Sequence, residues 1–168
     1  MKVVVQDASV LIDLAAADLL AAWFSLGIET LTTSLVWREV NRRSQKAKIR
    51  KFCRDERIQV VGMGTEVLSD ILRLKLDLPP QLSLNDVSVL HLAVARAAVL
   101  LTGDRNLRSA AEARAVTVCS LPALLEYLVQ EKALTTSTAA TKLELLCRLN
   151  PRLPKKECES LLAKWRTS

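Results

Sequence analysis

The sequence predicts an α/β fold of three layers, in which a parallel sheet carries helices on both faces and a C-terminal helical extension follows it. Short runs rich in β-branched residues alternate with stretches whose apolar residues recur at helical spacing. The short runs also lack polar alternation, which is typical of parallel strands buried on both sides. The 168 residues allow one ordinary domain, because domains usually span about 100 to 200 residues.

Five short runs are expected to form the strands, in this order: residues 3–5, 28–32, 58–61, 99–102 and 116–119. Helical patterns lie between them, for example around Leu68 and Ile71 or around Leu90 and Ala93. After Ser120 the strands stop, and three helices are expected at residues 121–132, 137–149 and 155–166. We therefore expect a domain at residues 1–132 and a helical extension at residues 133–168 that packs on it.

The last predicted helix has one apolar side. Cys158, Leu161, Leu162 and Trp165 follow the i, i+3, i+4, i+7 spacing of an amphipathic helix. Such a stripe must be buried against another surface. That surface is either the same domain, which we favour, or a second chain.

The composition excludes several classes of protein. Four glycines, none in a GxGxxG or GxxxxGK[ST] pattern, disfavour dinucleotide and phosphate-loop folds. The single His91 argues against catalytic triads and His-rich zinc sites, and the four cysteines form no CxxC pair. No basic-then-apolar secretory segment opens the chain, so we expect reduced thiols and a cytoplasmic protein. Charged residues interrupt the apolar runs before the roughly 20 residues of a membrane helix, so no membrane partner is expected.

Positive charge is concentrated in one segment. Residues 42–57 hold eight basic and two acidic residues, a net charge of +6 that equals the net charge of the whole chain. A local excess of this kind attracts polyanions, most often nucleic acid, through the release of counterions. A solvated helix face is the alternative. The candidate RNA-binding residues are Arg42, Arg43, Lys46, Lys48, Arg50, Lys51 and Arg54.

Two acids directly follow predicted strands. Asp7 follows the first strand and Asp104 the fourth, so both lie at the carboxyl ends of strands, where open α/β sheets bind their ligands. Each also suits a simpler role, because aspartate is a favoured N-cap for the helix that comes next.

Two further acids lie inside predicted helices. Asp86 is four residues from Leu90 on the apolar stripe of its helix, so its carboxylate is expected to face inward; with Ser83 it also forms a capping-box pattern. Glu39 lies one turn from Leu35 in a helix expected to begin near Ser34. Its alternative role is that of an ordinary helical glutamate paired with a nearby arginine.

The four acids are more informative together than separately. If the strands lie side by side, the acids converge on one edge of the sheet. Two such charges about 5 Å apart repel by roughly 3 kcal/mol at an effective dielectric near 20, so a cation is needed to keep them ionised. Oxygen ligands without His or Cys select Mg²⁺ or Mn²⁺.

The segments QDASVLIDL, SLVWREV, SLNDVSVLHLAVA and VLLTGDRNLR resemble, in this order, a PIN domain, the nuclease fold of the VapC-type toxin ribonucleases and their relatives. The resemblance covers about residues 1–130. It implies that Asp7, Glu39, Asp86 and Asp104 hold Mg²⁺ or Mn²⁺, supported by Ser9 and Thr102. Many relatives carry an acid where this chain has Asn106, which provides an oxygen without a charge.

The resemblance implies a metal-dependent endoribonuclease that leaves a 5′-phosphate and a 3′-hydroxyl. If the chain is the toxin of a toxin–antitoxin pair, the resemblance further implies a homodimer and a cognate antitoxin protein. Asn106 and the long helical extension favour one alternative, a PIN-like module that binds RNA or protein with weak or no catalysis. A second alternative is a phosphohydrolase with Asp7 as nucleophile. It is disfavoured because Asp7 is followed by Ala8 and Ser9 rather than by the second acid of a DxD motif.

Overall fold

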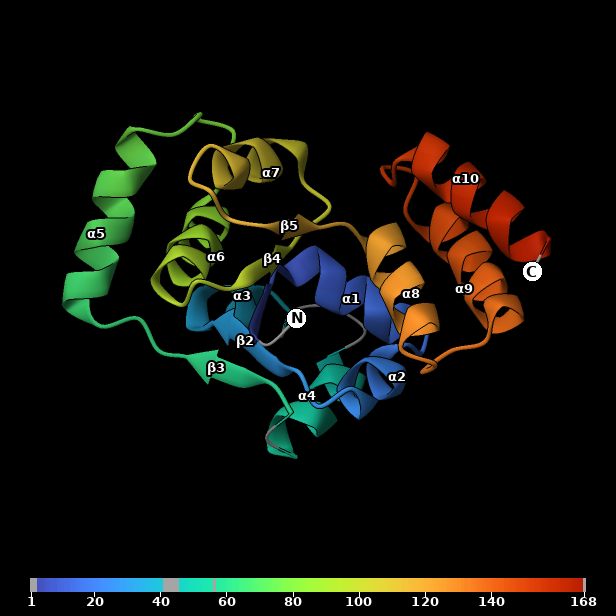
Figure 1. The fold of residues 1–168 in the computed structure, drawn as a ribbon. Coiled ribbons are helices and arrows are strands. Elements are labelled where there is room, and N and C mark those ends of the chain that lie inside the picture. Colours follow the sequence, from blue (N-terminus) through green and yellow to red (C-terminus); the bar gives the residue numbers. More distant parts are fainter. Residues whose placement is uncertain (1–2, 41–45, 56, 168) are drawn as a thin grey trace.

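The computed structural model describes residues 3–40, 46–55 and 57–167 (Figure 1). Its strands form one sheet in the order β3-β2-β1-β4-β5, and every neighbouring pair is parallel. The strands are β1 (Val3–Gln6), β2 (Glu29–Thr33), β3 (Gln59–Val61), β4 (Val99–Leu101) and β5 (Val118–Cys119). They differ from the predicted runs only at their ends, so the predicted strands and their parallel pairing are confirmed.

Helices connect the strands and continue beyond them. The helices up to β5 are α1 (Ala8–Ala16), α2 (Leu20–Ser25), α3 (Ser34–Val40), α4 (Lys46–Arg54), α5 (Thr65–Leu76), α6 (Leu84–Ala95) and α7 (Arg105–Glu112). Three helices follow β5: α8 (Leu121–Gln130), α9 (Thr136–Leu149) and α10 (Lys155–Arg166). They match the three C-terminal helices predicted from the sequence. None of the helices described is long and apolar enough to span a membrane.

Hydrogen bonds of Thr30 and Thr33 in β2 show that helices cover both faces of the sheet. Trp23 of α2 is fully buried, and its Nε1 donates to Thr30 Oγ1 at 3.0 Å. Three residues further along β2, Thr33 Oγ1 lies 2.8 Å from Ser88 Oγ of α6. Because side chains alternate between the two faces of a strand, α2 and α6 lie on opposite faces. The predicted three-layer architecture is therefore confirmed.

The central strand is buried, and one of its side chains is polar. Val4, Val5 and Gln6 of β1 have no exposed surface. The main-chain oxygen of Gln6 accepts a hydrogen bond from Thr32 Oγ1 at 3.0 Å. Within the described part of the chain, neither Oε1 nor Nε2 of Gln6 has a hydrogen-bond partner. A buried amide in this condition lowers the stability of the fold, by about 1 to 3 kcal/mol for each unpaired group.

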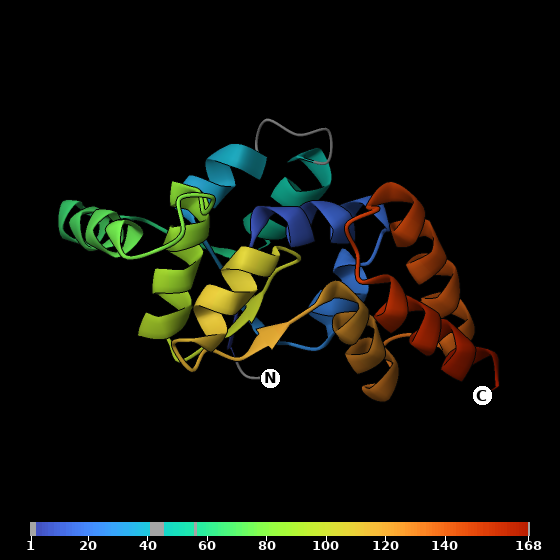
Figure 2. The same ribbon diagram turned by 90° about the horizontal axis from the view of Figure 1, so that it is seen from above.

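The C-terminal helices form a layer beside α8, at the end of the molecule opposite α5 (Figures 1 and 2). Cys158 and Trp165 of α10 are buried, and Leu161 and Leu162 pack against the core from half-buried positions. Trp165 Nε1 donates to Glu126 Oε2 of α8 at 2.8 Å. The predicted apolar stripe of α10 is thus buried within this chain, against α8 and α9.

Candidate active site

Asp7 lies at the carboxyl end of the central strand, with its main-chain nitrogen donating to Leu101 O of β4 at 3.1 Å. Its side chain is buried, with 8% of the residue exposed. Ser9 Oγ donates to Asp7 Oδ2 at 2.9 Å, and Thr102 Oγ1 donates to the same oxygen at 3.0 Å. Two hydroxyls from different elements therefore orient this carboxylate, and neither of them occupies Oδ1.

The pKa of Asp7 is raised from its ordinary value of 3.8 to about 6. Burial is the largest cause, and the negative charge of Asp86 raises the pKa further. The hydrogen bonds from Ser9 and Thr102 act in the opposite direction, because they stabilise the ionised form. An acid that is buried, oriented and close to a second acid at a strand terminus is a candidate functional group.

Thr102 connects Asp7 to Asp104. The Thr102 hydroxyl donates to Asp7 and accepts a hydrogen bond from the main-chain nitrogen of Asp104 at 3.0 Å. Asp104 is the N-cap of α7, where its Oδ1 accepts from the nitrogen of Leu107 at 2.8 Å. Asn106 follows in the first turn of α7 and is exposed. The capping role that the sequence allowed for Asp104 is confirmed.

Asp86 lies near Asp7 and also caps α6. Its Oδ2 accepts from the main-chain nitrogen of Ser83 and from Ser83 Oγ, each at 2.7 Å, which completes a capping box. The sequence prediction that Asp86 shares a buried stripe is correct in part. Leu90 and Ala93 are fully buried, but Val94, which the spacing also places on this stripe, is 49% exposed, so the buried face of α6 is narrower than the predicted stripe.

Glu39 belongs to α3 and forms a hydrogen bond with Asn85, the residue before Asp86. Asn85 Nδ2 donates to Glu39 Oε2 at 2.9 Å. These two residues line a hollow of about 380 Å³ together with Leu35 and Arg38. Asn85 was not singled out in the sequence, although its position next to Asp86 in SLND was the available signal.

Asp7 and Asp104 therefore lie at the carboxyl edge of the sheet and are linked through Thr102. Asp86 is near enough to Asp7 for its charge to raise the pKa of Asp7, and Glu39 contacts Asn85, the residue before Asp86. Within the described residues, no three His, Cys, Asp or Glu side chains are grouped closely enough to hold a metal ion. The all-oxygen donor set nevertheless fits Mg²⁺ or Mn²⁺. Asp86 and Asp104 each use one oxygen in a helix cap, and among the described groups none donates to the other oxygen.

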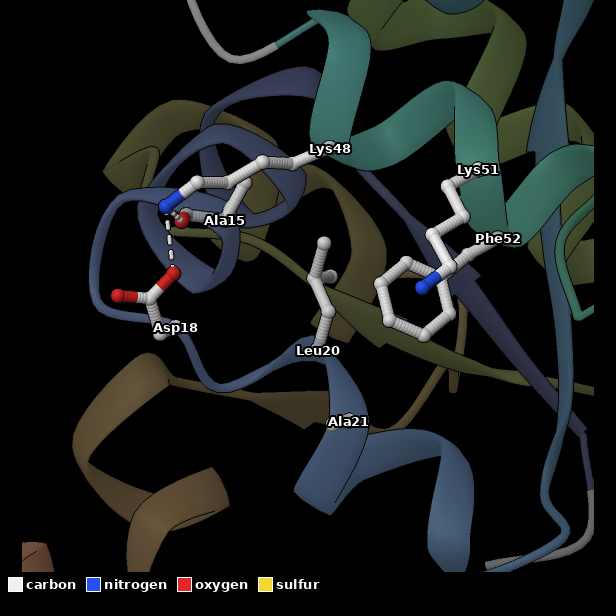
Figure 3. Close-up of a pocket in the computed structure, with 7 residues that line it drawn as sticks. All are labelled: Ala15, Asp18, Leu20, Ala21, Lys48, Lys51 and Phe52. Carbon is white, nitrogen blue, oxygen red and sulfur yellow. Dashed lines mark hydrogen bonds and ion pairs between the residues drawn. The ribbon is translucent and has the colours of Figure 1, made fainter.

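Residues 46–54 of the basic segment form helix α4, which is anchored by the buried Ile49. Figure 3 shows Lys48, Lys51 and Phe52 beside a hollow of about 230 Å³ against α1 and α2. Lys48 Nζ lies 2.5 Å from Asp18 Oδ1, and this ion pair lowers the pKa of Asp18. The remaining α4 candidates are exposed: Lys46, Arg50, Lys51 and Arg54. Arg42 and Arg43 lie outside the described residues.

This chain belongs to the PIN domain family, whose profile matches residues 3–167 and thus includes the C-terminal helices. PIN domains are generally nucleases that depend on divalent metals. The crystal structure of PAE2754 from Pyrobaculum aerophilum is similar, with a TM-score of 0.57 and 21% identity. The likeness covers 77% of this chain and 98% of that one, and it supports the fold. No curated protein matches the sequence. The match to the family profile confirms the resemblance that the four segments indicated.

Proposed function

We propose that this PIN domain is an endoribonuclease that hydrolyses RNA phosphodiester bonds with Mg²⁺ or Mn²⁺. The observation that carries the proposal is Asp7, a buried carboxylate oriented by Ser9 and Thr102 at the carboxyl end of the central strand. Burial without a counter-ion is costly for a carboxylate, and a bound divalent cation removes that cost.

Each acid has a distinct part in the proposed site. Asp7 is the fixed ligand, because two hydroxyls restrict its rotation. Asp86 and Asp104 complete the ligand set with the oxygen that their caps leave available. Glu39 is oriented by Asn85, an outer partner of the kind that positions metal-bound carboxylates. Asn106 supports the site as a neutral oxygen donor.

The bound cation would lower the pKa of a water molecule and offset the charge that develops on the phosphate. This chain's own residues place the ligand oxygens and exclude bulk water from Asp7. Because its pKa is raised to about 6, Asp7 takes up a proton at mildly acidic pH, which weakens its affinity for a cation. Activity should therefore fall as the pH drops through about 6.

The RNA-binding part of the proposal rests on the charge of α4 and the segment before it. Replacing Lys48, Arg50 and Lys51 with alanine should weaken binding and reduce the slope of log affinity against log salt. For single-stranded RNA, the slope should fall by about 0.7 for each phosphate that the variant no longer neutralises. Unchanged affinity together with an unchanged slope would exclude α4 from RNA binding.

The proposal also includes a cytoplasmic location, a homodimer and a role as the toxin of a toxin–antitoxin pair. Leu72 and Leu76 of α5 support the homodimer, because these apolar side chains are 54% and 85% exposed. Light scattering of the purified chain tests self-association. Co-purification with the product of an adjacent gene tests the antitoxin.

Cleavage of a labelled single-stranded RNA tests the central claim. The wild type should cut the RNA with Mg²⁺ or Mn²⁺ and stop when EDTA is added, whereas Asp7→Asn and Asp86→Asn should lose at least 100-fold in rate. Asp70→Asn is the matched control, because Asp70 is an exposed acid on α5, 3.6 Å from Arg73. Equal rates in all four proteins would refute the proposal.

A second function, an RNA- or protein-binding module without turnover, is favoured by two observations. No metal-binding group of three or more His, Cys, Asp or Glu side chains is found among the described residues, and Asn106 replaces a common acid. This alternative predicts RNA or protein binding with no cleavage in either metal. The same assay, run beside a binding measurement, distinguishes the two functions.

A further inference from the structure

A second concentration of positive charge lies where α9 passes into α10. Residues 148–156 contain four basic residues and no acid. We call these four the C-terminal basic surface: Arg148, Arg152, Lys155 and Lys156. All four are exposed, and none forms an ion pair with any residue that the structure describes.

The other basic residues near the end of the chain behave differently. Lys164 lies 2.5 Å from Glu126, and Arg166 lies 3.1 Å from Glu144. These pairs join α10 to α8 and to α9. The positive charge of the C-terminal basic surface has no such structural role, so it remains available to an external anion.

The position of this surface follows from the strand register. Gln6 of β1 is opposite Leu101 of β4, and Leu101 is opposite Cys119 of β5. The next residues of the three strands, Asp7, Thr102 and Ser120, therefore form a row along the carboxyl edge. Since neighbouring strands are about 4.8 Å apart, Ser120 lies about 10 Å from Asp7.

Two hydrogen bonds fix the beginning of α10 beside this row. Ser120 Oγ donates to Glu157 Oε1 at 2.7 Å, which places the residues just before Glu157 at the same edge. Asn150 Nδ2 donates to Asp13 Oδ2 of α1 at 2.8 Å and holds the preceding turn. In Figure 1 the connection between α9 and α10 is directed toward β5 and α7.

Lys155 and Lys156 also occupy a position that does not favour cations. They lie in the first turn of a 12-residue helix, whose N-terminus carries a partial positive charge and favours anions instead. Intrinsic helix stability therefore does not explain why two lysines stand there. A negatively charged ligand would stabilise this arrangement.

We propose that the C-terminal basic surface binds the phosphate backbone of single-stranded RNA on the β5 side of the acidic edge, by which we mean the carboxyl edge of the sheet where Asp7 and Asp104 lie. This inference rests on the proposed nuclease function, since the strand must cross that edge to be cut. Helix α4 precedes β3, the outer strand on the side of the sheet opposite β5, and β1 with Asp7 lies between these two strands. The two basic regions would therefore hold the RNA on both sides of Asp7.

Fluorescence anisotropy with a long and a short labelled single-stranded RNA, in EDTA to prevent cleavage, tests the inference. The test variant replaces the four residues of the C-terminal basic surface with glutamine and lowers the net charge from +6 to +2. We expect at least a 10-fold loss of affinity for the long RNA, a smaller loss for the short one, and a salt slope lower by about 2 to 3.

The matched control makes the same charge change away from the acidic edge. It replaces four exposed or half-exposed basic residues with glutamine. These residues lie on α5 and at the amino edge of the sheet: Arg73, Arg96, Arg114 and Lys132. Thermal unfolding checks that both variants fold.

Equal affinity of the test and control variants for the long RNA would overturn the inference. Cleavage by the wild type would still support the proposed function in that case. If the wild type bound RNA without cutting it, the nuclease would fail and the test variant would still decide the surface. A wild type that bound neither RNA would overturn the inference, and the cleavage assay with Mg²⁺ or Mn²⁺ would still decide the proposed function.

Discussion

Replacing Asp7 with asparagine should stabilise the fold at neutral pH, even though it removes the proposed metal ligand. Asparagine keeps an oxygen that can accept from Ser9 and Thr102, but it carries no charge. The pKa of Asp7 is raised from 3.8 to about 6 in the folded protein, mainly by burial. One pKa unit corresponds to 1.36 kcal/mol, so ionised Asp7 costs the folded state about 3 kcal/mol above pH 6.

The sign of this effect determines its pH dependence. Below pH 3.8 the carboxyl group is protonated in both the folded and the unfolded states and contributes nothing. Between pH 3.8 and pH 6 the unfolded state ionises first, so the stability of the wild type falls as the pH rises through this window. The advantage of Asp7→Asn should therefore be about 3 kcal/mol at pH 7.5 and only about 1 kcal/mol at pH 4.5.

Urea unfolding followed by circular dichroism, at both pH values and without divalent cations, measures this difference. Mn²⁺ provides a second measurement, because a ligand that binds only the folded state raises the unfolding temperature. Mn²⁺ should raise it for the wild type and not for Asp7→Asn. The reasoning would be refuted by a variant that is no more stable than the wild type at pH 7.5, or by a difference that does not change with pH.

Three further changes test neighbouring parts of the site. Asn85→Ala should weaken Mn²⁺ binding, measured by calorimetry, by about 10-fold, because Glu39 loses the amide that orients it; affinity equal to wild type would remove Asn85 from the site. Thr102→Val removes a hydrogen bond that stabilises ionised Asp7, so the acid limb of the pH–rate profile should move to higher pH, and a shift to lower pH would contradict this. Gln6→Met should stabilise the fold by about 1 to 2 kcal/mol in urea unfolding, because it replaces an unpaired buried amide with an apolar side chain of similar size; a destabilised variant would show that the amide is satisfied.

Local patterns in the sequence determined most of the fold. Runs such as Val3–Gln6 have no polar alternation because both faces of a parallel strand are buried, and this property can be read without knowing the partner strands. The positions of Asp7 and Asp104 directly after strands also fixed which edge of the sheet they occupy. The caps at Asp86 and Asp104 were predictable as well, because a cap depends on residues within one turn.

Only the tertiary structure decided which groups meet across the sheet. The hydrogen bonds of Asp7 with Thr102, and of Glu39 with Asn85, join residues 95 and 46 positions apart. Such pairs depend on strand order and helix placement, which periodicity does not encode. The same is true of Ser120 and Glu157, whose hydrogen bond brings a basic segment from the end of the chain to the edge where Asp7 lies. The sequence shows that residues 148–156 are basic, but only the hydrogen bond between Ser120 and Glu157 places them at this edge of the sheet.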